Sequence, residues 1–348
     1  MQTIVSGAGP RDAIALAWYR LGFRPRESLV LIGLHGPRRR TGALARADLP
    51  APEHRAPTLA SMIPYLQRCG DRQVVVLVVS DVDGGPRAGA EGEVLLPHRD
   101  LVAWLGPQLR RHGIEMFDVL AVGPSTFRSY LCEDTTCCPA EGESLELVAS
   151  SELAAHMVLE GKTFTQREED VVADVHPVAQ GGVTARRLRR MPAPDLAQVL
   201  RAWRKELAGD ADEPRDPAEL LVALRNVLLR DAVMFTLIPG SGLMPEAVLH
   251  GDLTQAEADA APWNHPPDDA LAERGRRLLA ALARVAPPGD RAEPLALLAW
   301  LAWWCNDAVR CRLLVDLALA DRPGHRLARL VGQLHAAAVP PTWWLQPH

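Results

Sequence analysis

Lysine and aromatic residues are scarce in this chain of 348 residues, and charge of neither sign dominates it. Lys162 and Lys205 are the only lysines among 38 basic residues, which face 43 acidic ones and leave a net charge of −5. A chain without a global positive field is not organised to recruit nucleic acid or anionic lipid. The preference for arginine, with abundant alanine and proline, indicates the codon bias of a GC-rich genome, so arginine counts carry little functional weight.

Long apolar runs and a secretory leader are also missing. The longest apolar run, Leu295 to Cys305, falls well short of the ~20 residues needed to span a bilayer. The opening residues MQTIVSGAGPRD contain neither the basic segment nor the apolar core of a signal peptide. Six cysteines in a chain of this length then fit reduced thiols better than a disulfide framework. We therefore expect a cytoplasmic protein with no membrane association.

The residues that are present have an ordinary globular composition, 48% hydrophobic and 23% charged, and they follow two different patterns along the chain. In the first 150 residues, helical periodicity alternates with short apolar runs, and Val74 to Val79 is the strongest strand signal because it is almost entirely β-branched. This alternation predicts an α/β fold, a sandwich with a mixed or partly parallel sheet. The expected helices are 11–21, 58–69 and 97–112, and the expected strands are 28–34, 43–49, 74–79, 117–122 and 127–131.

Beyond residue 150 the sequence shows helical patterns without a comparable strand. We therefore predict an α/β domain over 1–150, connecting helices over 151–190, and an all-helical C-terminal domain over 191–348, weakly repeat-like at its end. Trp300, Trp303 and Trp304 indicate either a bundle core or an exposed docking surface. Trp300 and Trp303 or Trp304 fall on one helix face by their spacing, which favours the core. The helices are predicted at 151–160, 165–173, 195–207, 217–237, 269–285, 293–305, 307–320 and 325–337.

Cys132, Cys137 and Cys138 form the densest cluster of reactive side chains, three thiols within seven residues. Three interpretations stay open: a zinc site completed by a distant His or Asp, a structural or redox-active disulfide from Cys132 to Cys137 or Cys138, and reduced thiols packed in a tight turn. Against zinc, the spacing differs from the usual two-armed knuckles, and adjacent cysteines on a strand point to opposite faces. Zinc is the metal cofactor that this cluster raises.

Two further groups of polar residues lie near predicted strand ends. Arg128, Ser129 and Tyr130 precede the first of the clustered cysteines, where they either hold a phosphate or carboxylate or pin the turn by a salt bridge. Asp81 and Asp83 follow the strongest strand, at the edge where α/β sheets bind ligands. These carboxylates either bind Mg²⁺ or act as acid and base, or they belong to an ordinary Asp-Gly turn.

The basic residues form two runs, at 38–40 and 186–190. Either run can contact phosphates, and either can be a solvated face of a loop or helix. No aromatic interleaving or nucleic-acid motif accompanies them, which argues against a nucleic-acid partner. Nucleic-acid binding would require the two runs to converge on one face.

The pattern R-S-Y-L-C-x4-C-C-P-x-x-G at 128–142 follows L-G-F-x-P-x-E-S-L-V-L-I-G-L at 21–34 and D-L-P at 48–50. This combination resembles the actinobacterial family catalogued as domain of unknown function 4192, over most of the chain. The chain departs from the family where Ser125, Thr126 and Phe127 replace the usual Gly-Arg-Trp. The resemblance implies a taxonomic origin but no activity, and it makes the cysteine turn the best candidate site. The matching positions are Leu21, Gly22, Phe23, Pro25, Ser28, Leu29, Val30, Asp48, Leu49, Pro50, Arg128, Ser129, Tyr130, Cys132, Cys137, Cys138, Pro139 and Gly142.

Two hypotheses about function follow from these patterns. In the first, the chain is an interaction or regulatory protein that binds a protein partner through its helical part and carries a ligand- or redox-responsive cysteine turn. In the second, it is a hydrolase or transferase with a small-molecule pocket at Asp81, Asp83 and Arg128.

Overall fold

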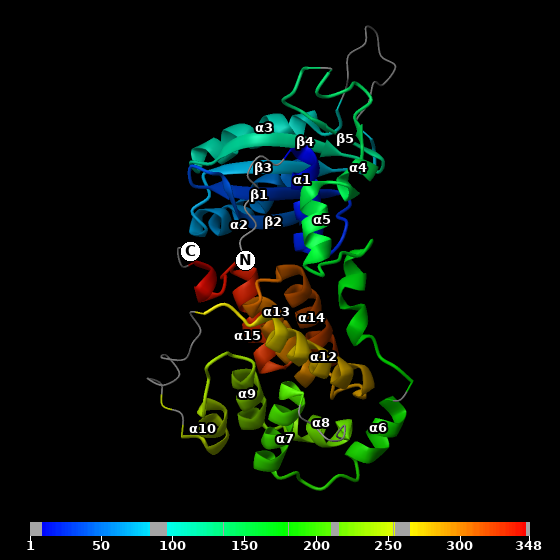
Figure 1. Ribbon diagram of the computed structural model, residues 1–348, viewed down its shortest axis with the longest axis vertical. Helices are drawn as coiled ribbons and strands as arrows, with labels where there is room; N and C mark the ends of the chain where they lie inside the picture. The colour runs from blue at the N-terminus through cyan, green and yellow to red at the C-terminus, as the bar shows by residue number, and fades with distance from the viewer. Residues whose placement is uncertain are drawn as a thin grey trace. The chain divides into compact units, whose positions relative to one another are not determined.

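The chain divides into two compact units, Met1–Asp170 and Val171–His348 (Figure 1). The computed structural model describes residues 9–83, 96–134, 136–179, 181–209, 216–252, 254 and 265–345. The expected fold class is confirmed, because a mixed sheet lies in the first unit and helices dominate the second. The division falls inside the stretch 151–190 that we expected to connect the two domains.

A six-stranded sheet forms the centre of the N-terminal unit, in the order β2-β1-β3-β4-β5-β6. β3 and β4 pair in parallel across the helix that connects them, and the other neighbouring strands of this sheet pair antiparallel. The sheet is therefore mixed, with a hairpin at each side of one parallel pair. The strands are β1 (Ser28–His35), β2 (Arg40–Asp48), β3 (Gln73–Val79), β4 (Glu115–Val122), β5 (Thr126–Ser129) and β6 (Glu143–Ser144).

Helices bury both faces of the central strands. α2 (Arg55–Arg68) and α3 (Arg99–Arg111) share one apolar cluster with alternate residues of β3, among them Val74, Val76 and Val78. The residues between them, such as Val75 and Leu77, are buried as well, and α1 (Pro10–Leu21) contacts β1. α1 also packs against α4 (Glu146–Ala149) and α5 (Glu152–Leu159), so α5 belongs to the first unit. A strand covered on both sides explains the uninterrupted apolar run.

A buried carboxylate fixes the hairpin of β1 and β2. Asp71 lies at the foot of β3, accepts a hydrogen bond of 2.9 Å from the Ala43 amide and lies 3.1 Å from His35 Nδ1. A Cβ atom at Gly33 or Gly42 would collide with this carboxyl group, so both positions require glycine. Burial raises the pKa of Asp71, and the bonds from Ala43 and His35 oppose that shift.

The C-terminal unit packs around α13 (Ala292–Trp304), which is buried along nearly its whole length. The helix has no polar face because α12, α14 and α15 contact it and enclose it. Trp300 and Trp304 are buried as expected and stack at 5.6 Å, whereas Trp303 is partly exposed and donates to the Val339 carbonyl at 2.8 Å. The surrounding elements are η2 (Glu168–Val175), α6 (Gly181–Leu188), α7 (Leu196–Ala208), α8 (Pro217–Leu224), α9 (Val227–Thr236), α10 (Met244–His250), α12 (Asp269–Val285), α14 (Ala308–Asp321), α15 (Arg326–Ala336) and η3 (Thr342–Leu345).

Two helix predictions in this half are wrong. The single helix expected over 217–237 is two helices, because Asn226 has an extended backbone and caps α9 by accepting from the amides of Leu228 and Leu229. The helix expected over 165–173 is the 3₁₀ segment η2, whose backbone departs from helical angles at Val172. The sequence patterns also missed α6 and α10. Within the described ranges, no helix has both the length and the apolar character to cross a membrane.

Candidate metal centre

The three clustered cysteines lie in the connection between β5 and β6. The chain leaves β5 at Tyr130, whose amide donates to the Val119 carbonyl at 2.8 Å, and it returns to the sheet after Gly142. Gly142 has a φ of 80° and its amide donates to the Pro139 carbonyl at 2.9 Å, which closes the return of the chain. Both ends of this cysteine turn, residues 130–142, are therefore anchored to the sheet.

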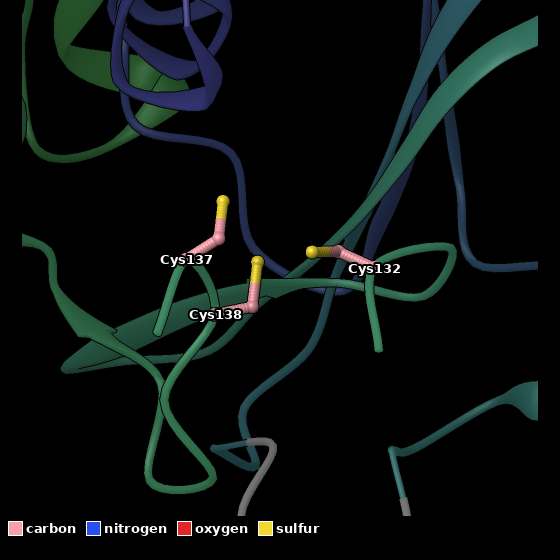
Figure 2. Close-up of side chains that lie close together, drawn as sticks. All are labelled: Cys132, Cys137 and Cys138. Carbon is pink, nitrogen blue, oxygen red and sulfur yellow. The ribbon is translucent and has the colours of Figure 1, made fainter. Parts of the chain in front are cut away.

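The sulfur atoms of Cys132, Cys137 and Cys138 all lie within 4.8 Å of one another. Figure 2 shows the Cys132 side chain pointing from one side of the turn toward the other two sulfur atoms. Cys138 is buried, Cys132 is partly buried and Cys137 is exposed, and no disulfide joins any of the six cysteines. In the part of the chain that the structure describes, no histidine, aspartate or glutamate joins this group, so it offers three ligand atoms and not the four that we expected of a zinc site.

Asp134 holds the middle of the turn in shape. Its carboxylate accepts from the Thr136 amide at 2.8 Å and from the Thr136 hydroxyl at 2.6 Å, and these bonds lower the pKa of Asp134. The Asp134 carbonyl accepts from the Cys138 amide at 2.7 Å. This Asx-type turn folds the chain back so that Cys138 lies beside Cys132.

The thiols affect each other's ionisation. Burial raises the pKa of Cys138 to about 12, and its contacts with Cys132 and Cys137 act in the same direction. A hydrogen bond with Cys132 and the repulsion between the two sulfur atoms raise the pKa of Cys137. Three adjacent thiolates become favourable only when a cation compensates their charge, as a bound metal does.

The spacing of the sulfur atoms is close to that of a metal-thiolate centre. A tetrahedral zinc ion with bonds of about 2.3 Å to sulfur separates its sulfur ligands by about 3.8 Å. Sulfur atoms within 4.8 Å of one another reach that arrangement by small side-chain movements. A disulfide, by contrast, brings one pair to about 2.0 Å and leaves the third thiol unused.

Arg128, Ser129 and Tyr130 bind protein groups around the base of the turn. Arg128 is buried and donates to the Ala140 carbonyl at 3.2 Å, while the Ser129 hydroxyl donates to Asp118 at 2.7 Å. The Tyr130 hydroxyl donates to the Pro97 carbonyl, and burial raises the pKa of this phenol. Arg128 thus pins the turn through a hydrogen bond to a carbonyl group, and among the described residues it forms no salt bridge.

Asp81 and Asp83 have separate partners. Asp81 is half exposed and forms two bonds with Arg26, at 2.9 and 3.1 Å. Asp83 accepts four hydrogen bonds of 2.5 to 3.2 Å from Ser125, in the turn between β4 and β5, and from Thr126, the first residue of β5. Partial burial acts to raise the pKa of Asp83, but these four bonds outweigh it and lower the pKa. The two carboxylates therefore fix local loops, and the residues after Asp83 that complete the predicted Asp-Gly turn lie outside the described ranges.

Sequence reasoning missed the residues that support the turn. Asp118 accepts from Ser129, and Asp134 organises the loop between the cysteines. A signal for the second was present, because aspartate two residues before threonine is typical of a turn closed by side-chain hydrogen bonds. Asp118 interrupts an apolar strand, which also marks it as a residue with a specific polar partner.

The fold and the turn together define a class of protein: a mixed α/β unit with a three-thiol turn at the edge of its sheet, and a helical unit that follows it in sequence. Comparison with family models gives the same grouping as the motifs. The chain belongs to the family described as domain of unknown function (DUF4192), whose model matches residues 10–342. The resemblance is therefore confirmed over nearly the whole chain. No curated protein and no solved structure matches the chain.

Proposed function

We propose that this protein is an interaction or regulatory protein whose cysteine turn binds one zinc-class metal ion through Cys132, Cys137 and Cys138. The observation that carries the proposal is the convergence of three sulfur atoms to within 4.8 Å. Thiolates are the protein ligands that soft and borderline metals prefer. The anchored ends of the turn and the Asp134 bonds pre-position the ligands, which lowers the cost of ordering them on binding.

The number of ligands supports a regulatory role and not a purely structural one. A structural zinc site has four protein ligands, whereas three protein ligands leave one position for water, a small ligand or a partner's side chain. Cys137 is exposed, so a ligand from outside can approach the ion. A donor atom from a partner protein would complete the coordination, and partner binding would then depend on the metal.

The other interpretations of the turn receive less support. Packing alone does not account for an exposed Cys137 beside a partly exposed Cys132. The hydrolase or transferase hypothesis depends on Asp81, Asp83 and Arg128, whose described contacts each hold a loop or turn in place. For the location we propose the reducing cytoplasm of an actinobacterium, where the three thiols stay available to a metal.

Titration of Co²⁺ into the reduced full-length protein tests the proposal. We expect one ion per chain, with the charge-transfer absorption of thiolate bound to cobalt and the visible bands of a tetrahedral site. Replacing any one of the three cysteines with serine should weaken binding at least about tenfold. Cys69→Ser is the matched control, because Cys69 belongs to the same unit but lies outside the turn.

The same cobalt-loaded protein tests the open coordination position. Added imidazole should shift the visible bands, because it can occupy the fourth position. Unchanged bands would contradict the regulatory role. Cobalt binding that survives all three serine substitutions would overturn the site itself, and a disulfide formed under mild oxidant in a protein that takes up no metal would assign the turn to redox chemistry.

A further inference from the structure

A second candidate site lies in the C-terminal unit, where the end of α6 packs against α8. It is a pocket of about 420 Å³ lined by two apolar residues, one carboxylate and three guanidinium groups: Met191, Pro192, Asp216, Arg186, Arg187 and Arg190. A volume of this size lies within the range typical of small-ligand sites. Three of its six lining residues carry positive charge.

Helical spacing explains why the arginines meet. Arg190 follows Arg186 by four residues and Arg187 by three, which are the separations that place side chains on one face of a helical turn. Asp216 approaches from the other side as the N-cap of α8, where it accepts from the Ala218 amide at 3.0 Å. The pocket therefore depends on two elements that are separated in sequence.

The charges in the pocket are unbalanced. Arg187 donates to Asp216 at 3.0 Å, so one guanidinium already holds an internal carboxylate. Arg186 and Arg190 have no side-chain hydrogen bond or ion pair with any residue that the structure describes, and both are exposed. Among the described residues, the planar donor arrays of Arg186 and Arg190 are thus unpaired beside the ion pair of Arg187 with Asp216.

We propose that this pocket binds the phosphate group of a small phosphate-bearing molecule. Arginine binds phosphate oxygens through paired N–H donors, and three guanidinium groups can satisfy several oxygens at once. Met191 and Pro192 provide an apolar wall for the rest of the ligand. A concave site with an apolar wall fits a small molecule better than the extended backbone of a nucleic acid, and the chain's net charge of −5 does not favour a nucleic acid either.

The proposal is tested by calorimetric titration of inorganic pyrophosphate into the full-length protein at low ionic strength. The double substitution Arg186→Gln and Arg190→Gln should weaken binding at least about tenfold, because it removes charge-assisted hydrogen bonds. Arg189→Gln is the matched control, since Arg189 is exposed in the same run but does not line the pocket. It should leave the affinity unchanged.

Asp216→Asn separates a binding role from a structural one. Asparagine caps helices about as well as aspartate, so α8 should keep its N-terminus, while the negative charge that competes for Arg187 is lost. We expect pyrophosphate to bind several-fold more tightly to this variant. A merely structural ion pair predicts no such gain.

Three outcomes would overturn the proposal. The first is a dissociation constant for pyrophosphate above about 1 mM. The second is a pyrophosphate affinity that the double substitution leaves unchanged. The third is binding of a single-stranded oligonucleotide that depends on Arg186 and Arg190 and with which pyrophosphate does not compete. The last outcome would assign the surface to nucleic acid. Because no residue of the cysteine turn is involved, these results are independent of the metal site.

Discussion

The two units of the chain place cysteine in opposite environments. In the N-terminal unit, three sulfur atoms converge within 4.8 Å on a turn at the sheet edge, and Cys137 is exposed. In the C-terminal unit, Cys311 is fully buried within the apolar cluster of the helices, where it packs as a small hydrophobic residue. Cys311 therefore serves packing, whereas the three converging thiols are the candidate site.

Ionisation alone does not distinguish the two environments. Burial raises the pKa of Cys311 to about 12, and burial with thiol neighbours raises the pKa of Cys138 to the same value. The difference lies in what surrounds each sulfur. Cys138 has two other sulfur atoms in reach, and Cys311 belongs to no such group among the residues described. The convergence of the sulfur atoms therefore distinguishes the candidate site, and the pKa values by themselves do not.

The largest contrast should appear in chemical labelling of the metal-free protein. At pH 8 we expect iodoacetamide to modify Cys137 at least about 100-fold faster than Cys311, because Cys311 is inaccessible and burial, which raises its pKa, keeps its thiol protonated. Labelling of Cys311 should accelerate as pH rises from 8 toward 11, because the fraction of Cys311 in the thiolate form grows as the pH approaches its raised pKa. Peptide mapping by mass spectrometry over time measures both rates, and equal rates would remove the contrast.

Serine substitutions should separate the two environments by stability. Cys311→Ser places a hydroxyl group in an apolar cluster and should lower the free energy of unfolding by about 1–3 kcal/mol. Cys137→Ser changes an exposed side chain and should leave the urea midpoint of the metal-free protein unchanged. Urea unfolding followed by circular dichroism tests both. If Cys311→Ser left the stability unchanged and Cys137→Ser lowered it, Cys137 and not Cys311 would be the residue that serves packing.

Asp83 extends the comparison to carboxylates. Asp83→Asn should lower the free energy of unfolding by about 1–2 kcal/mol, because Asp83 accepts four hydrogen bonds from Ser125 and Thr126. The pKa of Asp83 is lowered in the folded protein, so its contribution is present above the unfolded pKa of about 3.9 and is lost as pH falls through the lower folded value. Urea midpoints of wild type and variant should therefore converge in strong acid. A constant difference would contradict this role.

Asp81 should contribute much less to stability than Asp83. Its ion pair with Arg26 is exposed on both sides, and such pairs contribute little to stability. Asp81→Asn should shift the urea midpoint by less than about 0.2 M. A shift as large as that of Asp83→Asn would show that the exposed pair is structural.

Much of the fold could be predicted because its elements carry strong local signals. The β-branched run of β3 and the apolar helix α13 were both identified, since each is buried on all sides. The break between α8 and α9 was missed because apolar residues continue on either side of Asn226, and only its capping side chain marks the boundary. Local capping chemistry outweighed periodicity there.

The candidate sites were harder to predict because they depend on contacts between distant residues. Adjacent cysteines on a strand would point to opposite faces, but Cys137 and Cys138 lie in a turn closed by Asp134, and their sulfur atoms come together (Figure 2). The arginine pocket depends on Asp216, and nothing in the basic run at 186–190 indicates that Asp216 lies beside it. Spacing in the sequence identified these residues, and the fold determines which of them meet.

Native mass spectrometry of the protein, purified without chelator or reductant, shows whether the cysteine turn holds a metal ion. We expect an intact mass that exceeds the sequence mass by one zinc ion, and the loss of that excess when Cys132, Cys137 or Cys138 is changed to serine. The Cys69→Ser variant should keep the ion. A metal-free mass that stays unchanged after zinc is added would contradict the account.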